Sequence, residues 1–211
     1  MRISHSQLEE CLVNPARWYQ TSLIAEGHPY PMGYERALRL SVFHFHKSNA
    51  GEARRYLDRL IRKHKLSNAK RVSQIETDLD RYFAWAAKEA LRVADTNVNL
   101  AFQLGFLELR GKVGRIDITG TGYRAVLFAS APQDWERQLR MPLIQAATAS
   151  IYMRPAEKFE VGFQQLNGAN LVAKIYTSKD VELAEARFRR LGAVLEKLER
   201  DRKLRSSARR A

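Results

Sequence analysis

The chain has 211 residues, and its 36 lysines and arginines outnumber its 23 aspartates and glutamates, which gives a formal net charge of +13 and a pI near 10.1. No apolar run approaches the roughly 18 residues of a membrane-spanning helix, and the N-terminus lacks the apolar stretch of a signal peptide. The single cysteine, Cys11, excludes an internal disulfide and any cysteine-based metal site. We therefore expect an intracellular, cytoplasmic protein.

The excess of positive charge favours a polyanionic partner. Nucleic acid is the first candidate, and an anionic membrane surface is the second. A basic chain can also neutralise an acidic protein. The sequence contains no zinc-finger spacing, RNP motif, Walker loop or G-x-G-x-x-G, so no local motif defines the mode of binding.

The first half of the chain carries helical signals. The spacing of Ser6 and Glu9 is that of a capping box and predicts a short helix ending before Pro15, which can itself open a second helix. The prolines and glycines of residues 26–33 predict a loop. Apolar residues at helical spacing then predict three further helices, at 34–47, 50–66 and 73–94.

The hydrophobic period changes after residue 97. Alternation of apolar and polar residues at 97–119 predicts half-buried strands, with a turn or bulge at Gly105 or Gly111. The "GTG" at 120–122 predicts a tight turn before an apolar strand at 123–130. The remaining predicted elements are a helix at 134–152 in which Pro142 introduces a kink, two strands at 158–166 and 169–177, a helix at 179–200, and a frayed basic tail.

This order of elements predicts an α+β fold, in which a mostly antiparallel or mixed central sheet is flanked by helices. No linker is long enough to divide the chain, so a single domain is expected over 1–211. Within it we distinguish a mainly helical part at 1–96, a sheet core at 97–178, and a C-terminal helix with a basic tail at 179–211.

Several short motifs occur in a characteristic order. "SHSQLEECLVNPARWYQ" combines serines, a proline and aromatic residues, "LSVFHFHKS" contains His44, and "GRID" ends in Asp117. The later segment "RQLRMPLIQAATA" carries Gln138 and Gln145. In order and local motif the chain resembles the RecB-like branch of the PD-(D/E)XK nuclease superfamily, and the resemblance spans nearly the whole chain. It implies a restriction-endonuclease-like core, and a helix with glutamine near its start that lines the DNA channel.

The resemblance also implies a catalytic constellation that this sequence lacks. Members of the family hold one or two Mg²⁺ ions between carboxylates on adjacent strands, beside a lysine that orients the attacking water. Here the second acid would fall near Leu127 or Phe128, and the lysine near Ala129 or Ser130. Asp117 remains as the metal-binding candidate, with His44 as a second site remnant. We therefore expect a degenerate centre without a cofactor.

Displaced catalytic residues are the competing interpretation. Glu108 could complete the site if it faces the same side as Asp117, and Lys112 could replace the missing lysine. The protein would then be an active nuclease dependent on Mg²⁺ or Mn²⁺. An iron–sulfur cluster is excluded, because Asn14 stands where some relatives have a cysteine. Simpler structural roles also exist: Asp117 can cap the following turn, and His44 can be a hydrogen-bonded core histidine.

Basic residues concentrate at two places along the chain, where they are expected to contact phosphates without choosing a sequence. The predicted nucleic-acid contacts are Arg54, Arg55, Arg59, Arg62, Lys63, Lys65, Lys70 and Arg71 in the first run, Arg202, Lys203 and Arg205 in the second, and Arg115 and Gln138 between them.

The sequence therefore predicts a DNA-binding protein with a nuclease fold and an incomplete catalytic centre. Its expected setting is a DNA-processing or defence assembly, in which a partner such as a helicase or nuclease complex supplies the chemistry; no membrane partner is expected. An active metal-dependent nuclease, and a structural subunit that binds an acidic protein or RNA, are the two alternatives.

Overall fold

The structure is a computed structural model that describes residues 1–24 and 31–208. Helices dominate the first half of the chain, and a mixed sheet forms most of the second half. The predicted α+β class is confirmed. Most of the predicted loop at 26–33 lies outside the described residues. In chain order the elements are β1 (Arg2–Ser4), α1 (Leu8–Val13), α2 (Pro15–Ile24), α3 (Tyr34–Lys47), α4 (Ala50–Lys63), α5 (Ala69–Lys88), β2 (Val93–Leu104), β3 (Leu107–Ile118), β4 (Tyr123–Phe128), η1 (Trp135–Arg137), α6 (Arg140–Ile151), η2 (Ala156–Lys158), β5 (Phe159–Gln164), β6 (Val172–Lys174) and α7 (Ser178–Ala208).

The described strands form one six-stranded sheet whose centre is the meander β2–β3–β4. Both pairings within the meander are antiparallel. Helix α6 then returns the chain so that β5 pairs with β4 in parallel, and β6 adds an antiparallel edge. At the other end of β3, the short strand β1 pairs in parallel with residues 108–110. The sheet is therefore mixed, with β3 and β4 at its centre.

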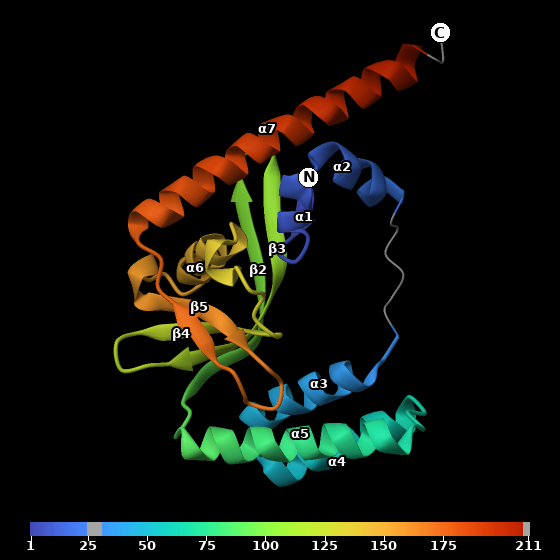
Figure 1. Cartoon of the computed structure of the whole chain (residues 1–211), viewed down its shortest axis with the longest axis vertical. Coiled ribbons are helices and arrows are strands. Elements are labelled where there is room, and N and C mark those ends of the chain that lie inside the picture. Colours follow the sequence, from blue (N-terminus) through green and yellow to red (C-terminus); the bar gives the residue numbers. More distant parts are fainter. Residues whose placement is uncertain (25–30, 209–211) are drawn as a thin grey trace.

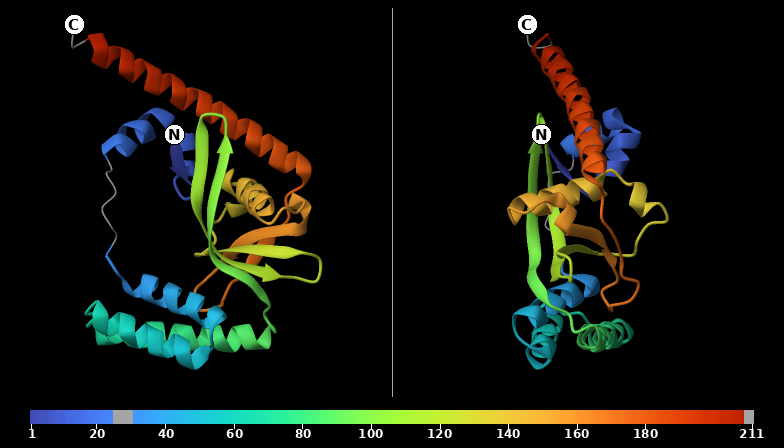
Figure 2. Two further views of the ribbon diagram at one scale, coloured as in Figure 1. Left: turned by 180° about the vertical axis from the view of Figure 1, so that it is seen from behind. Right: turned by 90° about the vertical axis from the view of Figure 1, so that its left-hand side faces the viewer.

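Helices cover the sheet in separate groups (Figure 1). The bundle α3–α5 lies at one end of the molecule and α7 crosses the opposite end, an arrangement that both views of Figure 2 repeat. Three apolar clusters match these groups: one joins α3–α5 to β4, one joins α6 to the middle of the sheet, and one joins α1, α2 and α7 to the start of β3. None of the described helices combines the length and apolar character needed to span a bilayer.

An irregularity in β2 and β3 decides which side of the sheet faces α5. Val98 pairs with Val113 and Thr96 pairs with Arg115; between these pairs Asn97 adopts a left-handed backbone conformation with φ of 56°. Val113 packs in the cluster beneath α6, whereas Arg115, two residues further on, contacts α5. Regular alternation would place both on one face, so β3 is distorted between them although the register with β2 is kept there. The register shift between the two strands lies further on, between Val93 and Asp95, where it can turn the end of β3 as bulges do.

Several predicted boundaries differ from those observed. Gly111 lies inside β3, which is one continuous strand of 12 residues, and the turn before it is at Gly105. The strand β1 was not predicted, because three residues carry no periodic signal. Pro142 lies in the first turn of α6, where no intrahelical donor is required, so it does not interrupt the helix. Helix α7 continues to Ala208 instead of fraying after residue 200.

Gly162 in β5 offers a test of the close pairing between β5 and β6. A Cβ atom at this position would lie 1.9 Å from the carbonyl oxygen of Val172, a backbone atom that cannot move aside without breaking the pairing. We expect Gly162→Ala to lower the free energy of unfolding by about 1–3 kcal/mol, because the added methyl group overpacks the site. Urea titrations measure this loss. Gly120→Ala is the control, since nothing lies within 4 Å of a Cβ there; equal stability of the two variants would contradict this packing.

Candidate functional site

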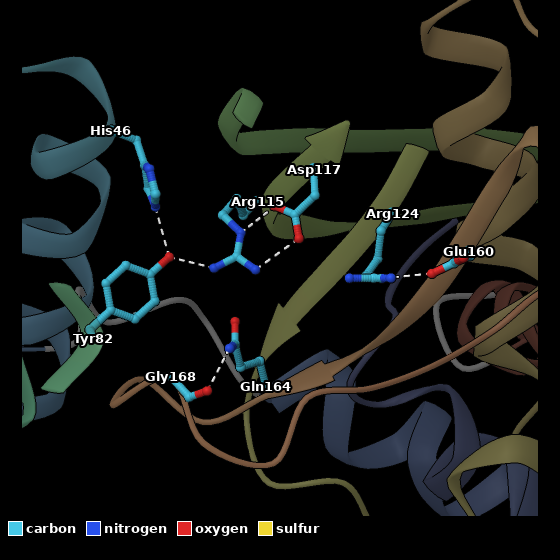
Figure 3. A network of polar contacts seen from close by, with 8 residues as sticks. All are labelled: His46, Tyr82, Arg115, Asp117, Arg124, Glu160, Gln164 and Gly168. Carbon is cyan, nitrogen blue, oxygen red and sulfur yellow. Dashed lines mark hydrogen bonds and ion pairs between the residues drawn. The ribbon is translucent and has the colours of Figure 1, made fainter. Parts of the chain in front are cut away.

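The carboxylate of Asp117 is held in a buried ion pair at the end of β3. Arg115 donates from Nε to one of its oxygens and from Nη2 to the other, the latter at 2.8 Å. The Arg115 residue is 0% exposed and Asp117 is 1% exposed. Figure 3 shows the guanidinium and the carboxylate facing each other side by side. This geometry is bidentate, the arrangement in which arginine binds carboxylates most strongly.

The same guanidinium joins the sheet to α5. Its Nη1 atom donates to the hydroxyl oxygen of Tyr82, and the aromatic rings of Trp85 and Phe128 lie 5.0 and 5.6 Å from the guanidinium carbon. Burial alone would lower the pKa of Arg115, but the hydrogen bonds and negative charge of its partners hold that pKa above its usual value. Because it is fully buried, Arg115 is not available for the phosphate contact that its charge suggested.

His46, rather than His44, extends this network towards α3 (Figure 3). Its Nε2 atom lies 2.7 Å from the Tyr82 hydroxyl, and the oxygen of that hydroxyl accepts from Arg115. Burial, with the nearby positive charge of Arg115, lowers the pKa of His46 to about 4. His44 stacks on Tyr56 of α4, with ring centroids 4.6 Å apart. Residues two apart on a helix point in nearly opposite directions, so only one of these histidines reaches the network.

The strand next to Asp117 places a cation, and not a second acid, opposite it. Arg124 of β4 is the register partner of Asp117, and its Nε atom donates to Glu160 of β5 at 2.6 Å. Of the positions where the second acid was expected, Leu127 is 5% exposed and Phe128 is 6% exposed, and the Phe128 ring covers the Arg115 guanidinium. An aromatic ring therefore occupies one of the two positions at which a second acid was expected, and it lies against the Arg115 guanidinium.

The donor set around Asp117 does not fit a divalent metal ion. Both of its carboxylate oxygens accept from Arg115, and hard cations require several free oxygen ligands. Across residues 1–24 and 31–208, no three histidine, cysteine, aspartate or glutamate side chains gather in a way that could hold a metal. No catalytic step through a metal can be built from these side chains.

The residues suggested as displaced catalytic groups lie away from Asp117. Glu108 is nine residues earlier on the same strand, about 30 Å along it at the usual rise per residue. There it binds Arg2 at 3.2 Å and Arg110 at 2.9 Å. Lys112 is exposed on β3, five residues before Asp117. The structure does not bring either side chain to the Arg115–Asp117 pair.

The two glutamines singled out from the sequence have structural partners. Gln138 accepts from Arg140 Nε at 2.7 Å, at the start of α6. Gln145 is fully buried and uses both ends of its amide on the backbone of Tyr176. Gln138 is partly exposed and remains a candidate for nucleic-acid contact. Gln145 instead holds α6 against the segment before α7.

The first basic run forms an exposed surface at the end of α4 and the start of α5, which we call the α4–α5 corner. Two of its predicted residues are paired: Arg54 lies 2.8 Å from Asp80, and Arg55 pairs with Glu52. The other six form no ion pair with any carboxylate of the described residues. These six define the corner: Arg59, Arg62, Lys63, Lys65, Lys70 and Arg71.

The second basic run differs, because acids on the same helix neutralise much of it. Glu199 accepts from both Arg202 and Lys203 at 3.3 Å, and Arg200 pairs with Glu196 at 2.6 Å, one turn earlier. Arg205 is exposed, with no ion pair to a described carboxylate. Because α7 and the α4–α5 corner lie at opposite ends of the molecule (Figure 1), the two runs do not form one surface.

No protein-family model and no curated protein matches the chain. Among solved structures it is similar to a protein from Eubacterium rectale named as a putative exonuclease, with 12% identity, a TM-score of 0.47, and coverage of 81% of this chain and 70% of that one. It is also similar to the protein SSO0001, with 9% identity, a TM-score of 0.28 and coverage of 81% of each chain. With both TM-scores below 0.5, these likenesses establish neither a family nor an activity.

The buried pair predicts a large and specific cost for Asp117→Asn. This substitution removes the negative charge and leaves a buried guanidinium without its counter-ion, so we expect a loss of about 3 kcal/mol in the free energy of unfolding. Glu160→Gln removes the acid of the partly exposed pair with Arg124 and should cost less than about 1 kcal/mol. Urea titrations of both variants provide the comparison; similar losses would mean that burial does not set the strength of the Arg115–Asp117 pair.

His46 predicts a pH dependence of stability with a defined sign. Its pKa is lowered from 6.5 to about 4 in the folded chain, so the unfolded chain binds the proton first as the pH falls. The stability that neutral His46 contributes is present above pH 6.5 and is lost between pH 6.5 and 4, by up to about 3 kcal/mol.

His46→Gln isolates this contribution, because a glutamine amide can accept from Tyr82 but does not titrate in this range. The variant should lose less stability than the wild type between the two pH values, as measured by urea midpoints. His64→Gln, at an exposed histidine that ends α4, is the matched control and should follow the wild type. If stability fell with pH identically in the wild type and both variants, His46 would not be the source of the pH dependence.

Proposed function

We propose that this chain is a DNA-binding protein with a nuclease-like α+β fold, and that the α4–α5 corner is its main phosphate-binding surface. The observation that carries the proposal is the concentration of six exposed cations without carboxylate partners in this corner. Unpaired cations attract phosphates and release the counter-ions condensed on DNA, and that release supplies affinity without sequence preference.

The corner is favoured over α7 for an electrostatic reason. A phosphate that approaches Arg200, Arg202 or Lys203 must compete with a carboxylate already within ion-pair distance. A phosphate that approaches the corner meets no such competitor among the described residues. We assign α7 a secondary role in DNA binding, through Arg205 and the exposed faces of its paired arginines.

We further propose that the protein does not cleave DNA by itself. The support is chemical: the carboxylate that would bind the metal is engaged by Arg115, and the neighbouring strand presents Arg124 to it. Since a hydrolytic partner would then be needed for any DNA processing, we propose that the chain acts as a subunit beside a helicase or nuclease.

The DNA-binding surface can be tested by removing two charges from the corner. Lys63→Gln combined with Lys65→Gln should weaken DNA binding and reduce the slope of log affinity against log salt by up to about 2, since each lost phosphate contact changes it by about 1. Arg200→Gln with Arg202→Gln, in paired residues of α7, is the control and should have a smaller effect. Fluorescence anisotropy over a salt series measures both; a larger loss in the α7 variant would place the main surface there.

Cleavage is tested on labelled single- and double-stranded DNA with Mg²⁺ or Mn²⁺. We expect binding without cleavage. Cleavage that requires the metal and disappears in Asp117→Ala would show a working catalytic centre and refute the proposed inactivity. Circular dichroism of that variant is needed alongside, because the substitution also breaks the buried ion pair.

A further inference from the structure

A groove runs between α3 and α5, beside the α4–α5 corner. One pocket of about 400 Å³ lies at the start of both helices and is lined by Tyr34, Arg71 and Gln74, among others. A second pocket, of about 470 Å³, lies further along and reaches the end of β4. Both are lined by Glu35 and Ile75, so the two hollows share a wall and follow one another along the helices.

The charges along this groove change from its mouth to its interior. At the mouth, the Arg71 guanidinium lies 5.5 Å from the centre of the Tyr34 ring, next to the other cations of the corner. Inside, the acids Glu35 and Asp78 contribute to the walls, and each pairs with an arginine, Glu35 with Arg39 and Asp78 with Arg81. The positive charge without a carboxylate partner therefore lies at the mouth, which attracts a phosphate, whereas the acids of the interior are compensated.

The interior suits a neutral, planar group with hydrogen-bonding edges. Its floor is apolar and its rim carries uncharged polar side chains. The floor is formed by Leu38, Ile75 and Phe128, and the rim by Ser130, Gln165 and Asn167. Both pockets have volumes typical of sites for small organic ligands, which are mostly apolar with a few polar groups that fix orientation.

The far end of the groove coincides with the degenerate centre. Phe128, Ala129 and Ser130 line it there, and these are positions at which the resemblance to PD-(D/E)XK nucleases placed the missing acid and lysine. A strand held at the α4–α5 corner would therefore be directed along α3 and α5 towards the end of β4. This inference rests on the proposed DNA binding.

We infer that this groove receives an unpaired base of single-stranded DNA, with the phosphates of that strand held at the α4–α5 corner. The bases of a duplex are paired and stacked, so they cannot enter a pocket between two helices. Single-stranded DNA exposes its bases, and stacking of one base on an aromatic side chain, here Tyr34 or Phe128, gives roughly a tenfold gain in affinity. The groove thus makes the protein selective for single strands. The phosphate contacts of the α4–α5 corner alone do not distinguish single strands from duplexes.

Gln74→Trp tests the groove, because Gln74 is exposed and lines the pocket at its mouth, where a bulky ring would block entry. Ser73→Trp adds the same ring at the neighbouring exposed position, which lines neither pocket. Affinities are measured by anisotropy for one labelled oligonucleotide, alone and annealed to its complement, at the same salt concentration. Lys63→Gln with Lys65→Gln is measured in parallel.

We expect the wild type and Ser73→Trp to bind the single strand about tenfold more tightly than the duplex. Gln74→Trp should lose that difference and keep its duplex affinity. Equal binding of both DNA forms by the wild type, or an equal loss for both forms in Gln74→Trp, would overturn the inference. In either case the proposed function would still stand if the double lysine variant bound both forms more weakly. It would fail separately if the double lysine variant bound DNA as well as the wild type.

Discussion

The contacts of the buried Arg115 guanidinium are the interaction on which the packing of the helical first half of the chain against the sheet depends. It binds Asp117 within its own strand and Tyr82 on α5, and it lies against the rings of Trp85 and Phe128. A charged group removed from water is costly unless its donors are paired, so the position of α5 over the sheet is restricted to one that supplies these partners. The α4–α5 corner and the groove between α3 and α5 are placed by the same restriction.

The same pair changes what the sheet can do chemically. A nuclease of the class that the sequence resembles needs Asp117 as a free anion that can bind a metal ion, whereas here its charge is neutralised inside the protein. Arg124, its partner across the strands, adds a second cation beside it and pairs with Glu160. A carboxylate that accepts two hydrogen bonds from a buried arginine has little capacity left for a metal ion, so the chemistry of Asp117 in this fold is structural.

Pairing of charges matters more than their number in this basic protein. The runs near α4 and along α7 are both rich in arginine and lysine, but acids are far more frequent along α7. On α7, Glu185, Glu196 and Glu199 lie one turn from Arg189, Arg200 and Lys203 and pair with them. That spacing of three to four residues is visible in the sequence and predicts the pairs. In the α4–α5 corner only Asp58 has this spacing, four residues before Arg62, and the described structure forms no ion pair between their side chains; Arg62 donates instead to the backbone oxygen of Asp58. The positive charge of the corner is therefore available to a partner.

The sequence by itself determined the α+β class, the order of the main helices and strands after β1, and the absence of a second acid and a lysine after Asp117, because hydrophobic period and residue identity are local properties. Only the tertiary structure decided the rest. The irregularity at Asn97 turned Arg115 and Asp117 towards α5, and packing of α3 against α5 brought His46, and not His44, to Tyr82. These outcomes depend on contacts between segments far apart in the chain, and such contacts leave no periodic signal in the sequence around either partner.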